Sequence, residues 1–200
     1  MTNGVNIVVP IKGLRAGKSR LRGLLTNKER YALNRYLSNK ILSVLATINR
    51  DFTCYVISRD EELEAVARKS GAEFMLQRSI GLNNALHEAS RVIPNHRTIY
   101  IASDLPNLQC SDLEALADVV GIGLAPDKTS TGTNAISLPT PVSIPFCFGH
   151  DSFSRHCDEA GKLNTNLIII RRPGLEFDID TNDELRRWKG WPLENIKRRV

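Results

Sequence analysis

Apolar runs alternate with amphipathic segments along the 200 residues of the chain. The runs are short and rich in β-branched side chains, a composition typical of buried strands. They predict strands at residues 6–10, 54–58, 73–77, 98–103, 121–126, 135–138 and 167–171. The segments between them have helical spacing, and the first carries one apolar face made of Leu33, Leu37, Ile41, Val44, Leu45 and Ile48.

Three of the helical segments open with a hydroxyl side chain that is followed three residues later by a glutamate. In this capping box the hydroxyl accepts a backbone N–H of the first turn, and the carboxylate reaches back to the capping residue. The pattern predicts helix starts at the pairs Thr26 and Glu29, Ser111 and Glu114, and Thr181 and Glu184. Gly71 is placed to end a helix that begins near Asp60.

Strands that alternate with helices form βαβ units, whose crossovers produce a mostly parallel sheet covered on both faces. We therefore expect a three-layer α/β fold, formed as one domain over residues 1–200. Residues 138–148 contain three prolines and few charges, and we expect them to form an irregular loop. For residues 188–200 we expect a packing role, with a homodimer contact or a frayed tail as alternatives.

The composition narrows the class of protein. With 42% hydrophobic residues the chain can bury a sizeable core. It has no run of roughly 20 apolar residues, which a membrane span needs, and no secretion signal at its start. We therefore expect a soluble, cytoplasmic protein without a membrane partner. The four cysteines form no Cys-x-x-Cys pair, which favours reduced thiols, and zinc ligation is disfavoured by the spacing of His150, His156, Cys147 and Cys157.

The formal net charge of +5 indicates an anionic partner. Most basic residues are scattered, whereas a nucleic-acid binder more often has a dense basic stripe or interleaved aromatics, so we expect a small anion and no nucleic acid. The first strand is followed by a basic loop with Lys12, Lys18 and Arg20, which could also be a solvated face. Lys18 lies in a Gly-Lys-Ser sequence like the end of a P-loop, but only three residues separate Gly13 from Gly17, one fewer than that motif needs.

Carboxylates follow two other predicted elements. Asp104 comes directly after the strand at 98–103, and Asp178 and Asp180 precede the last predicted helix. In an extended segment residues two apart point to the same side, roughly 7 Å apart. Ligands of parallel sheets bind outside the carboxyl ends of the strands, and Mg²⁺ prefers oxygen ligands together with substrate phosphates. The three acids and the basic loop therefore predict a metal and phosphate site, although each acid alone is equally typical of a turn or a cap.

Three further segments place polar groups at the same predicted edge. Leu82 and Asn83 open a helix and are predicted to contact a nucleotide, with a simple N-cap role for the asparagine as the alternative. Thr133 ends a hydroxyl-rich turn, and Gly149 and Ser152 lead into a helix whose first N–H groups suit an anion. These segments are consistent with a second phosphate, although each is also commonplace as a loop.

Six ordered motifs over nearly the whole chain resemble the 2-phospho-L-lactate guanylyltransferase family: VPIKGLRAGKSRL, GLNNAL, IASDLPNL, APDKTSTGTNAISL, FGHDSFSRH and GLEFDIDTNDEL. The resemblance implies a nucleotidyltransferase-like (Rossmann-like) fold and an enzyme of coenzyme F420 biosynthesis. Such enzymes join the GMP part of GTP to a phosphorylated three-carbon acid and release diphosphate. The acceptor is 2-phospho-L-lactate, phosphoenolpyruvate or 3-phospho-D-glycerate, and the likeness to bacterial members favours the latter two.

The resemblance also implies roles for individual residues. Magnesium would be held by Asp104, Asp178 and Asp180, the acceptor acid by Thr133, Gly149 and Ser152, and the GTP phosphates by the loop from Lys12 through Lys18 to Arg20. Two departures from the family pattern stand out. Residues 77–80 lack an acid that many relatives carry, and Ser130 stands where glycine is common.

Two other functions remain open from the sequence. A transferase that uses a nucleotide-sugar donor could also present an Asp-x-Asp motif such as Asp178-Ile179-Asp180. A non-catalytic nucleotide-binding module would share the basic loop. Release of diphosphate from GTP distinguishes the guanylyltransferase from both.

Overall fold

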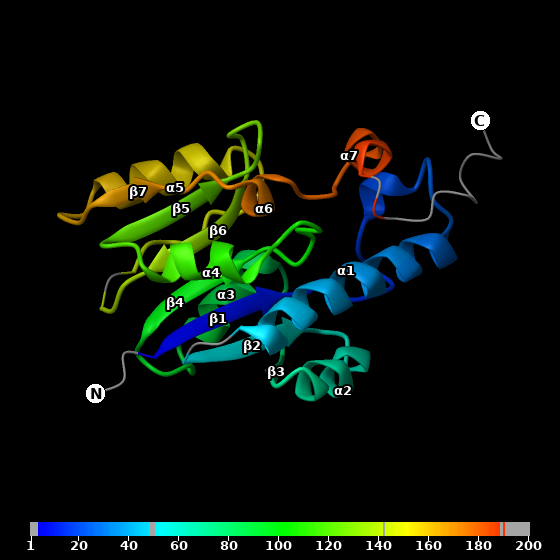
Figure 1. Cartoon of the computed structure of the whole chain (residues 1–200), viewed down its shortest axis with the longest axis horizontal. Coiled ribbons are helices and arrows are strands. Elements are labelled where there is room, and N and C mark those ends of the chain that lie inside the picture. The colour runs from blue at the N-terminus through cyan, green and yellow to red at the C-terminus, as the bar shows by residue number, and fades with distance from the viewer. Residues whose placement is uncertain (1–3, 49–50, 142, 189, 191–200) are drawn as a thin grey trace.

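A computed structural model of the chain describes residues 4–48, 51–141, 143–188 and 190. Within them one mixed sheet has the strand order β3-β2-β1-β4-β6-β5-β7, with helices on both of its faces (Figure 1). The strands are β1 (Val5–Pro10), β2 (Phe52–Ser58), β3 (Glu73–Leu76), β4 (Arg97–Ile101), β5 (Ile122–Pro126), β6 (Thr133–Leu138) and β7 (Leu167–Ile169). Four of the six strand pairs are parallel, so the prediction of a mostly parallel three-layer α/β fold is confirmed.

The central strand β1 explains why the predicted strands are continuous apolar runs. Ile7 and Val9 pack on one face of the sheet and Val8 on the other, and all three are fully buried. A strand covered on both faces has no side that faces solvent, so apolar residues replace the alternating polar residues in its sequence.

The helices divide between the two faces. Apolar residues of α1 (Asn27–Thr47), α2 (Glu62–Lys69), α4 (Cys110–Ala117) and α6 (Pro173–Glu176) belong to one core cluster. Those of α3 (Leu82–Ser90) and α5 (Ser152–Gly161) belong to a second cluster on the opposite face. Gly71 follows α2 with a φ of +76°, as expected for the residue that ends a helix.

A third, smaller core cluster lies beyond the sheet. Figure 1 shows α1 extending past the sheet toward the 3-10 helix η1 (Ser19–Leu21) and α7 (Asn182–Arg187). The cluster is made of Leu21, Leu25, Leu33, Leu37, Ile179, Leu185 and Trp188. It therefore joins the segment after β1 to the segment before α7. Trp188 packs against Tyr36 with ring centroids 5.6 Å apart, as the predicted packing role requires, whereas most of residues 188–200 lie outside the described residues.

Strand β6 departs from a purely parallel arrangement. It runs antiparallel to both β4 and β5, and it begins at Thr133, two residues before the predicted start. An antiparallel strand starts at the edge where its parallel neighbours end. The amino end of β6 therefore lies at the same rim of the sheet as the carboxyl ends of β1 and β4.

The capping boxes at Thr26 and Thr181 are confirmed, with Glu29 and Glu184 as their partners. The predicted box at Ser111 is wrong, because α4 begins at Cys110 and the backbone N–H of Gln109 donates to Asp112 Oδ2 at 2.9 Å.

The hydroxyl of Ser111 instead accepts from Arg172 Nη2 at 3.1 Å. The same arginine donates to Asp112 Oδ1 at 2.6 Å. Asp112 thus both caps α4 and contacts a residue distant in the sequence. Residues 138–148 contain no regular element after Leu138 in their described part, as predicted.

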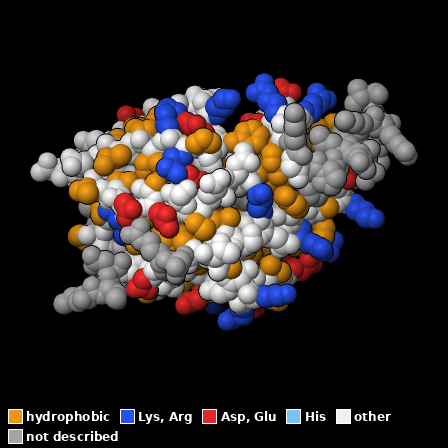
Figure 2. Space-filling model, viewed as in Figure 1, with side chains coloured by type: hydrophobic (Ala, Val, Ile, Leu, Met, Phe, Trp, Pro, Cys, Tyr) orange, Lys and Arg blue, Asp and Glu red, His pale blue; other side chains and the backbone are white. Residues whose placement is uncertain are grey.

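Two surface properties accompany the fold. Lysine and arginine side chains are spread over the face seen in Figure 2 rather than gathered in one stripe. None of the helices in the described part of the chain combines the length and apolarity that a membrane crossing needs.

Replacing Thr26 by alanine removes the hydroxyl that accepts the Glu29 N–H, so Thr26→Ala should lower the free energy of unfolding by about 1 kcal/mol. Urea denaturation measures the difference. Thr47→Ala is the matched control, since Thr47 is at the other end of α1 and bonds only helix carbonyls and Cys110. The control should change stability by less than about 0.5 kcal/mol. Equal losses in both variants would show that the capping box contributes nothing.

Candidate active site

The candidate site lies at the carboxyl ends of β1 and β4, two neighbouring parallel strands. On one side of this strand pair the sheet continues from β1 to β2 and β3. On the other side it continues from β4 to β6 and β5, so the order of the strands reverses between β1 and β4. Open α/β sheets bind ligands at such a reversal of strand order. The loops that carry the predicted site residues leave the sheet at this point.

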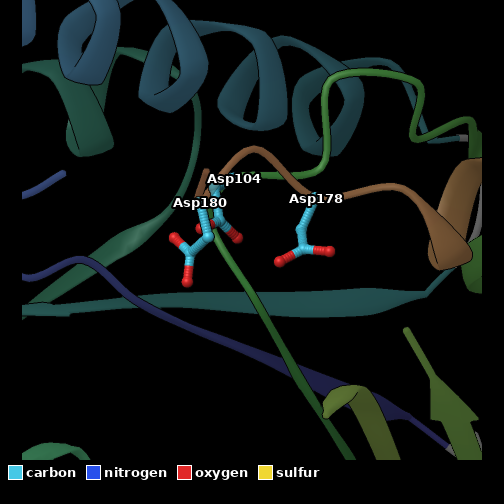
Figure 3. Close-up of side chains that lie close together, drawn as sticks. All are labelled: Asp104, Asp178 and Asp180. Atoms are coloured by element: carbon cyan, nitrogen blue, oxygen red, sulfur yellow. The ribbon is translucent and has the colours of Figure 1, made fainter. Parts of the chain in front are cut away.

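Asp104, Asp178 and Asp180 meet at this rim, with one carboxylate oxygen of each within 4.8 Å of the others (Figure 3). Asp104 follows β4 by three residues, and the other two acids lie between α6 and α7. Ile179 between them is fully buried in the third core cluster, and its N–H donates to the Asp104 carbonyl at 3.3 Å. The extended backbone therefore buries one side chain and turns both flanking carboxylates toward Asp104.

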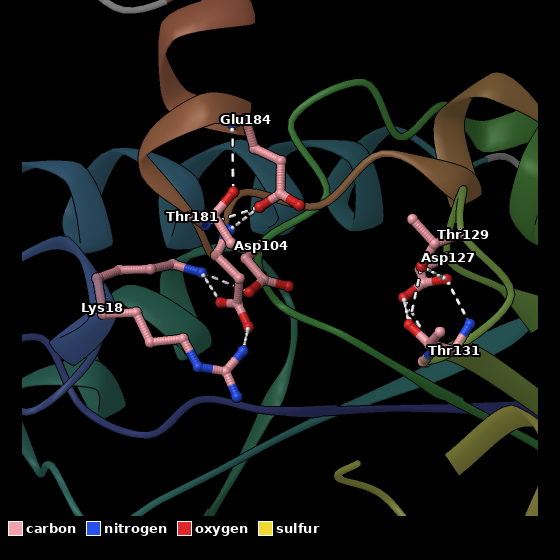
Figure 4. Close-up of polar contacts among 10 residues, drawn as sticks. Lys18, Asp104, Asp127, Thr129, Thr131, Thr181 and Glu184 are labelled. Atoms are coloured by element: carbon pink, nitrogen blue, oxygen red, sulfur yellow. Dashed lines mark hydrogen bonds and ion pairs between the residues drawn. The ribbon is translucent and has the colours of Figure 1, made fainter. Parts of the chain in front are cut away.

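Two basic side chains of the loop after β1 reach these acids (Figure 4). Lys18 Nζ pairs with Asp104 and, at 3.1 Å, with Asp180 Oδ1, while Arg20 Nη1 lies 3.2 Å from Asp180 Oδ2. Only 7% of the Lys18 side chain is exposed, compared with 74% for Arg20. The backbone of Lys18 has a φ of +55°, a strained region for a residue with a side chain. The structure thus holds Lys18 as a counter-ion inside the acid cluster.

The charges of the cluster shift its pKa values in different directions. Burial opposes the charge of Lys18, but Asp104 and Asp180 outweigh it and raise the pKa of the ammonium. Burial also acts against ionised Asp180, yet Lys18 and Arg20 lower its pKa below the usual value. Burial, followed by the charges of Asp104, Glu184 and Asp180, raises the pKa of Asp178 to about 7. Burial, with the charge of Asp180, also raises the pKa of Asp104 despite the nearby Lys18, so Asp104 and Asp178 share the cost of burying three carboxylates together.

The donor set fits a hard divalent cation. The cluster offers three carboxylate oxygens from three residues and no sulfur or imidazole ligand, which suits Mg²⁺ better than zinc. Burial, followed by the charges of the neighbouring acids, raises the pKa of Asp178, and a cation among the three oxygens would lower that pKa again.

The predicted acceptor residues also come together. The Thr133 N–H donates to Ser152 Oγ at 2.9 Å, and both residues are buried. Thr133 Oγ1 lies 2.9 Å from Nδ1 of His156, a fully buried residue that sequence reasoning did not assign to the site. The neighbouring Ala102 N–H donates to the Asn134 carbonyl at 2.8 Å. The start of β6 is thus bonded to the segment that leads from β4 to Asp104.

Asp127 organises the turn before Thr133, and the sequence analysis overlooked it. Its carboxylate accepts the N–H groups of Thr131 and Gly132 at 3.0 and 2.8 Å, and the hydroxyls of Thr129 and Thr131 also donate to it (Figure 4). Ser130 in this turn has a φ of +59°, a conformation that glycine adopts more readily than serine. An aspartate that opens a turn rich in Thr, Ser and Gly was the available signal.

The start of α3 contacts the loop that contains Gly149. Asn83 Oδ1 accepts the Phe148 N–H at 2.9 Å, and Asn83 Nδ2 donates to the Phe148 carbonyl at 3.2 Å. Both ends of this amide are thus occupied by the backbone of Phe148, the residue before Gly149. Leu82 beside it is 43% exposed and has its side chain available for a ligand.

Glu88 shapes the segment before α3, which includes residues 77–80. Its carboxylate accepts the N–H groups of Arg78 and Ser79 and the Ser79 hydroxyl, and these bonds with Ser79 lower its pKa. The loop is therefore held by a carboxylate that lies nine residues after Ser79, within α3.

The remaining predicted residues are less constrained. Lys12 is on the basic loop with an exposed side chain, and Gly149 is exposed with a φ of +123° that favours glycine. Two hollows of about 370 and 410 Å³ lie elsewhere, one beside His96 and Thr98 and one beside Met75 and Ala89. None of the three acids lines either hollow.

Comparison with known proteins places this geometry in a family. The chain is 35% identical to a phosphoenolpyruvate guanylyltransferase of Chloroflexus aggregans, over 92% of this chain and 96% of the relative. It is 29% identical to a 3-phospho-D-glycerate guanylyltransferase of Colwellia psychrerythraea, over 90% and 89% of the two chains.

Solved structures with a similar fold include a nucleotidyl transferase. A solved nucleotidyl transferase from Methanothermobacter superposes with a TM-score of 0.62 at 15% identity, covering 92% of this chain and 94% of the other. The nucleotidyltransferase-like fold is thereby confirmed. The family model described as guanylyl transferase CofC like matches residues 5–188, nearly the whole described chain. The protein therefore belongs to the CofC-like guanylyl transferase family.

Proposed function

We propose that the protein is a Mg²⁺-dependent guanylyltransferase that joins the GMP part of GTP to a phosphorylated three-carbon acid, in coenzyme F420 biosynthesis. The observation that carries the proposal is the meeting of three carboxylates, Lys18 and Arg20 at the rim where Thr133 and Ser152 also lie. Membership of a family whose relatives are named guanylyltransferases supports the same reaction.

The chemistry requires positive charge more than it requires a base. An acceptor phosphate oxygen attacks the α-phosphorus of GTP, the new P–O bond forms, and the bond to the β-phosphate breaks to release diphosphate. The attacking oxygen is already ionised near neutral pH, so no side chain needs to remove a proton. Two anions must nevertheless approach each other, and catalysis consists mainly of alignment and neutralisation of charge.

The acid cluster and the basic loop divide this task. Asp104, Asp178 and Asp180 would hold Mg²⁺, which neutralises charge on the phosphates when it is bound. Lys18 of the basic loop pairs with Asp104 and Asp180, and its ammonium would pair with the GTP phosphates once a cation takes its place among the acids. Arg20 and the exposed Lys12 extend the positive charge along the loop.

The two substrates would use neighbouring segments, since Asn83 bonds to Phe148, the residue before Gly149. Leu82 at the start of α3 offers an apolar surface for the guanine, and Asn83 acts beside it through the backbone of Phe148. Thr133, Gly149 and Ser152 would hold the acceptor acid. The relatives named for phosphoenolpyruvate and 3-phospho-D-glycerate make these two acids, with 2-phospho-L-lactate, the acceptors to test.

Incubation with GTP, Mg²⁺ and each of the three acids separately tests the proposed function. One acid should yield a guanylated product, identified by its mass, together with an equal amount of diphosphate. Turnover of a nucleotide-sugar without diphosphate release from GTP would instead identify a sugar transferase. Binding of GTP without product from any acid would identify a non-catalytic module.

Asp104→Asn removes one negative charge from the cluster while keeping the side-chain size. We expect turnover to fall by at least about 10²-fold, the scale of losing a preorganised electrostatic contact. Diphosphate release under saturating substrates measures it. Asp183→Asn is the matched control, since Asp183 is an exposed acid of the nearby α7 and should leave turnover unchanged. Near-normal release from Asp104→Asn would falsify the metal assignment.

Lys18→Met removes the ammonium that pairs with Asp104 and Asp180 in the present structure. Because that ammonium competes for the same oxygens, Mg²⁺ should bind the nucleotide-free variant about tenfold more tightly, the scale of one hydrogen bond to a charged group. Titration calorimetry measures the affinity. Lys12→Met, on the same loop but exposed, should match the wild type. Unchanged or weaker binding to Lys18→Met would contradict the counter-ion role.

A further inference from the structure

His156 on α5 is fully buried and connects two segments of the acceptor site. Its Nε2 lies 2.9 Å from the Cys147 backbone nitrogen, and its Nδ1 lies 2.9 Å from Thr133 Oγ1. A backbone N–H can only donate, so Nε2 must accept with its lone pair. The proton state of the whole ring then follows from this one contact.

The ring is neutral near pH 7. Burial, together with the charge of Arg155, lowers the pKa of His156 to about 4. A neutral imidazole carries one N–H, and since Nε2 accepts, that N–H is on Nδ1. His156 therefore donates from Nδ1 to the Thr133 hydroxyl oxygen.

This donation settles what the Thr133 hydroxyl can do. Its oxygen already accepts from His156, so its own proton remains for a hydrogen bond to something else. Ser152 is in the same state, because its oxygen accepts the Thr133 N–H. Among the described residues neither hydroxyl donates to a protein acceptor. The two side chains thus form a pair with both protons still to be used, beside the segment that leads to Asp104.

We propose that His156 is a positioning residue that keeps Thr133 as a hydrogen-bond donor, so that the hydroxyl pair selects an unprotonated oxygen of the acceptor's carboxylate or phosphate. The inference rests on the proposed function, because it concerns the acceptor of that reaction. Two hydroxyl donors bind an anionic oxygen through charge-assisted hydrogen bonds. A ligand that presents a hydroxyl or another donor at that place would find no acceptor, so its donor would stay unpaired at a cost in affinity.

Two substitutions separate this role from simple packing. In His156→Asn the side-chain amide lies where Nδ1 was, so it can still donate to Thr133 but cannot accept from Cys147. In His156→Gln the amide reaches the position of Nε2, so it can accept from Cys147 but no longer donates to Thr133. Each variant thus keeps one of the two hydrogen bonds and loses the other.

The steady-state constants for both substrates measure the effect. His156→Gln should raise KM for the acceptor acid by about tenfold or more, the scale of one buried hydrogen bond to a charged group, and change KM for GTP by less than about twofold. His156→Asn should stay within about threefold of the wild type for both. Equal losses in the two variants, or a smaller loss in His156→Gln, would overturn the inference.

A double-mutant cycle tests whether His156 acts through the Thr133 hydroxyl, which a role in packing alone would not require. In a Thr133→Val background the hydroxyl is absent, so adding His156→Gln should change KM for the acceptor no further. Independent, multiplying effects of the two substitutions would contradict a role through Thr133.

If neither His156 variant folds, the tautomer of the wild-type protein decides. Nitrogen NMR of the histidine-labelled chain should find His156 protonated on Nδ1 and unprotonated on Nε2, whereas the opposite tautomer would refute the inference. This measurement needs no turnover, so it is independent of the proposed function. Absence of transfer by the wild type would refute the function alone, and transfer with equal losses in both variants would refute only the role of His156.

Discussion

The constraint on which the site depends is the crowding of three carboxylates that come from two distant parts of the chain. Burial, followed by the charges of the neighbouring acids, raises the pKa of Asp178 to about 7. Burial of Ile179 and its backbone bond to Asp104 hold the acids together despite the repulsion of their charges. Packing of one apolar side chain thus maintains a concentration of negative charge that a cation can use.

The basic loop compensates the negative charge of the three carboxylates. Lys18 and Arg20 bring positive charge to the acids, and Lys18 does so from a strained backbone conformation. The third core cluster holds the ends of both segments, because Leu21 of η1 and Ile179 pack in it together. Charge compensation in the cluster is therefore tied to apolar packing beyond the sheet.

Polar contacts help to hold the loops around the cluster. Asp127 accepts backbone N–H groups of the turn before β6, and Asn83 pairs with both backbone groups of Phe148. The buried His156 bonds to Cys147 and Thr133, and because buried polar groups are costly unless they are paired, this contact restricts both segments strongly. The same requirement fixes which hydroxyl oxygens accept and which protons remain for a ligand.

Local features of this chain could be predicted from the sequence. Continuous apolar runs identified the strands, because a strand buried on both faces tolerates few polar side chains. The boxes at Thr26 and Thr181 depend on atoms three residues apart, and the common direction of Asp178 and Asp180 depends only on an extended backbone.

Other features depend on which strands become neighbours. The antiparallel direction of β6 brings Thr133 to the rim, and Lys18 meets acids 86 and 162 residues away. Asp112 at the start of α4 meets Arg172, which is 60 residues away, and His156 meets Thr133, 23 residues earlier in the chain. Periodicity along the chain contains no information on such pairings, because they are decided by the packing free energy of the whole sheet. The sequence by itself therefore determined the elements and the type of chemistry, while only the tertiary structure decided which charges and hydroxyls face one another.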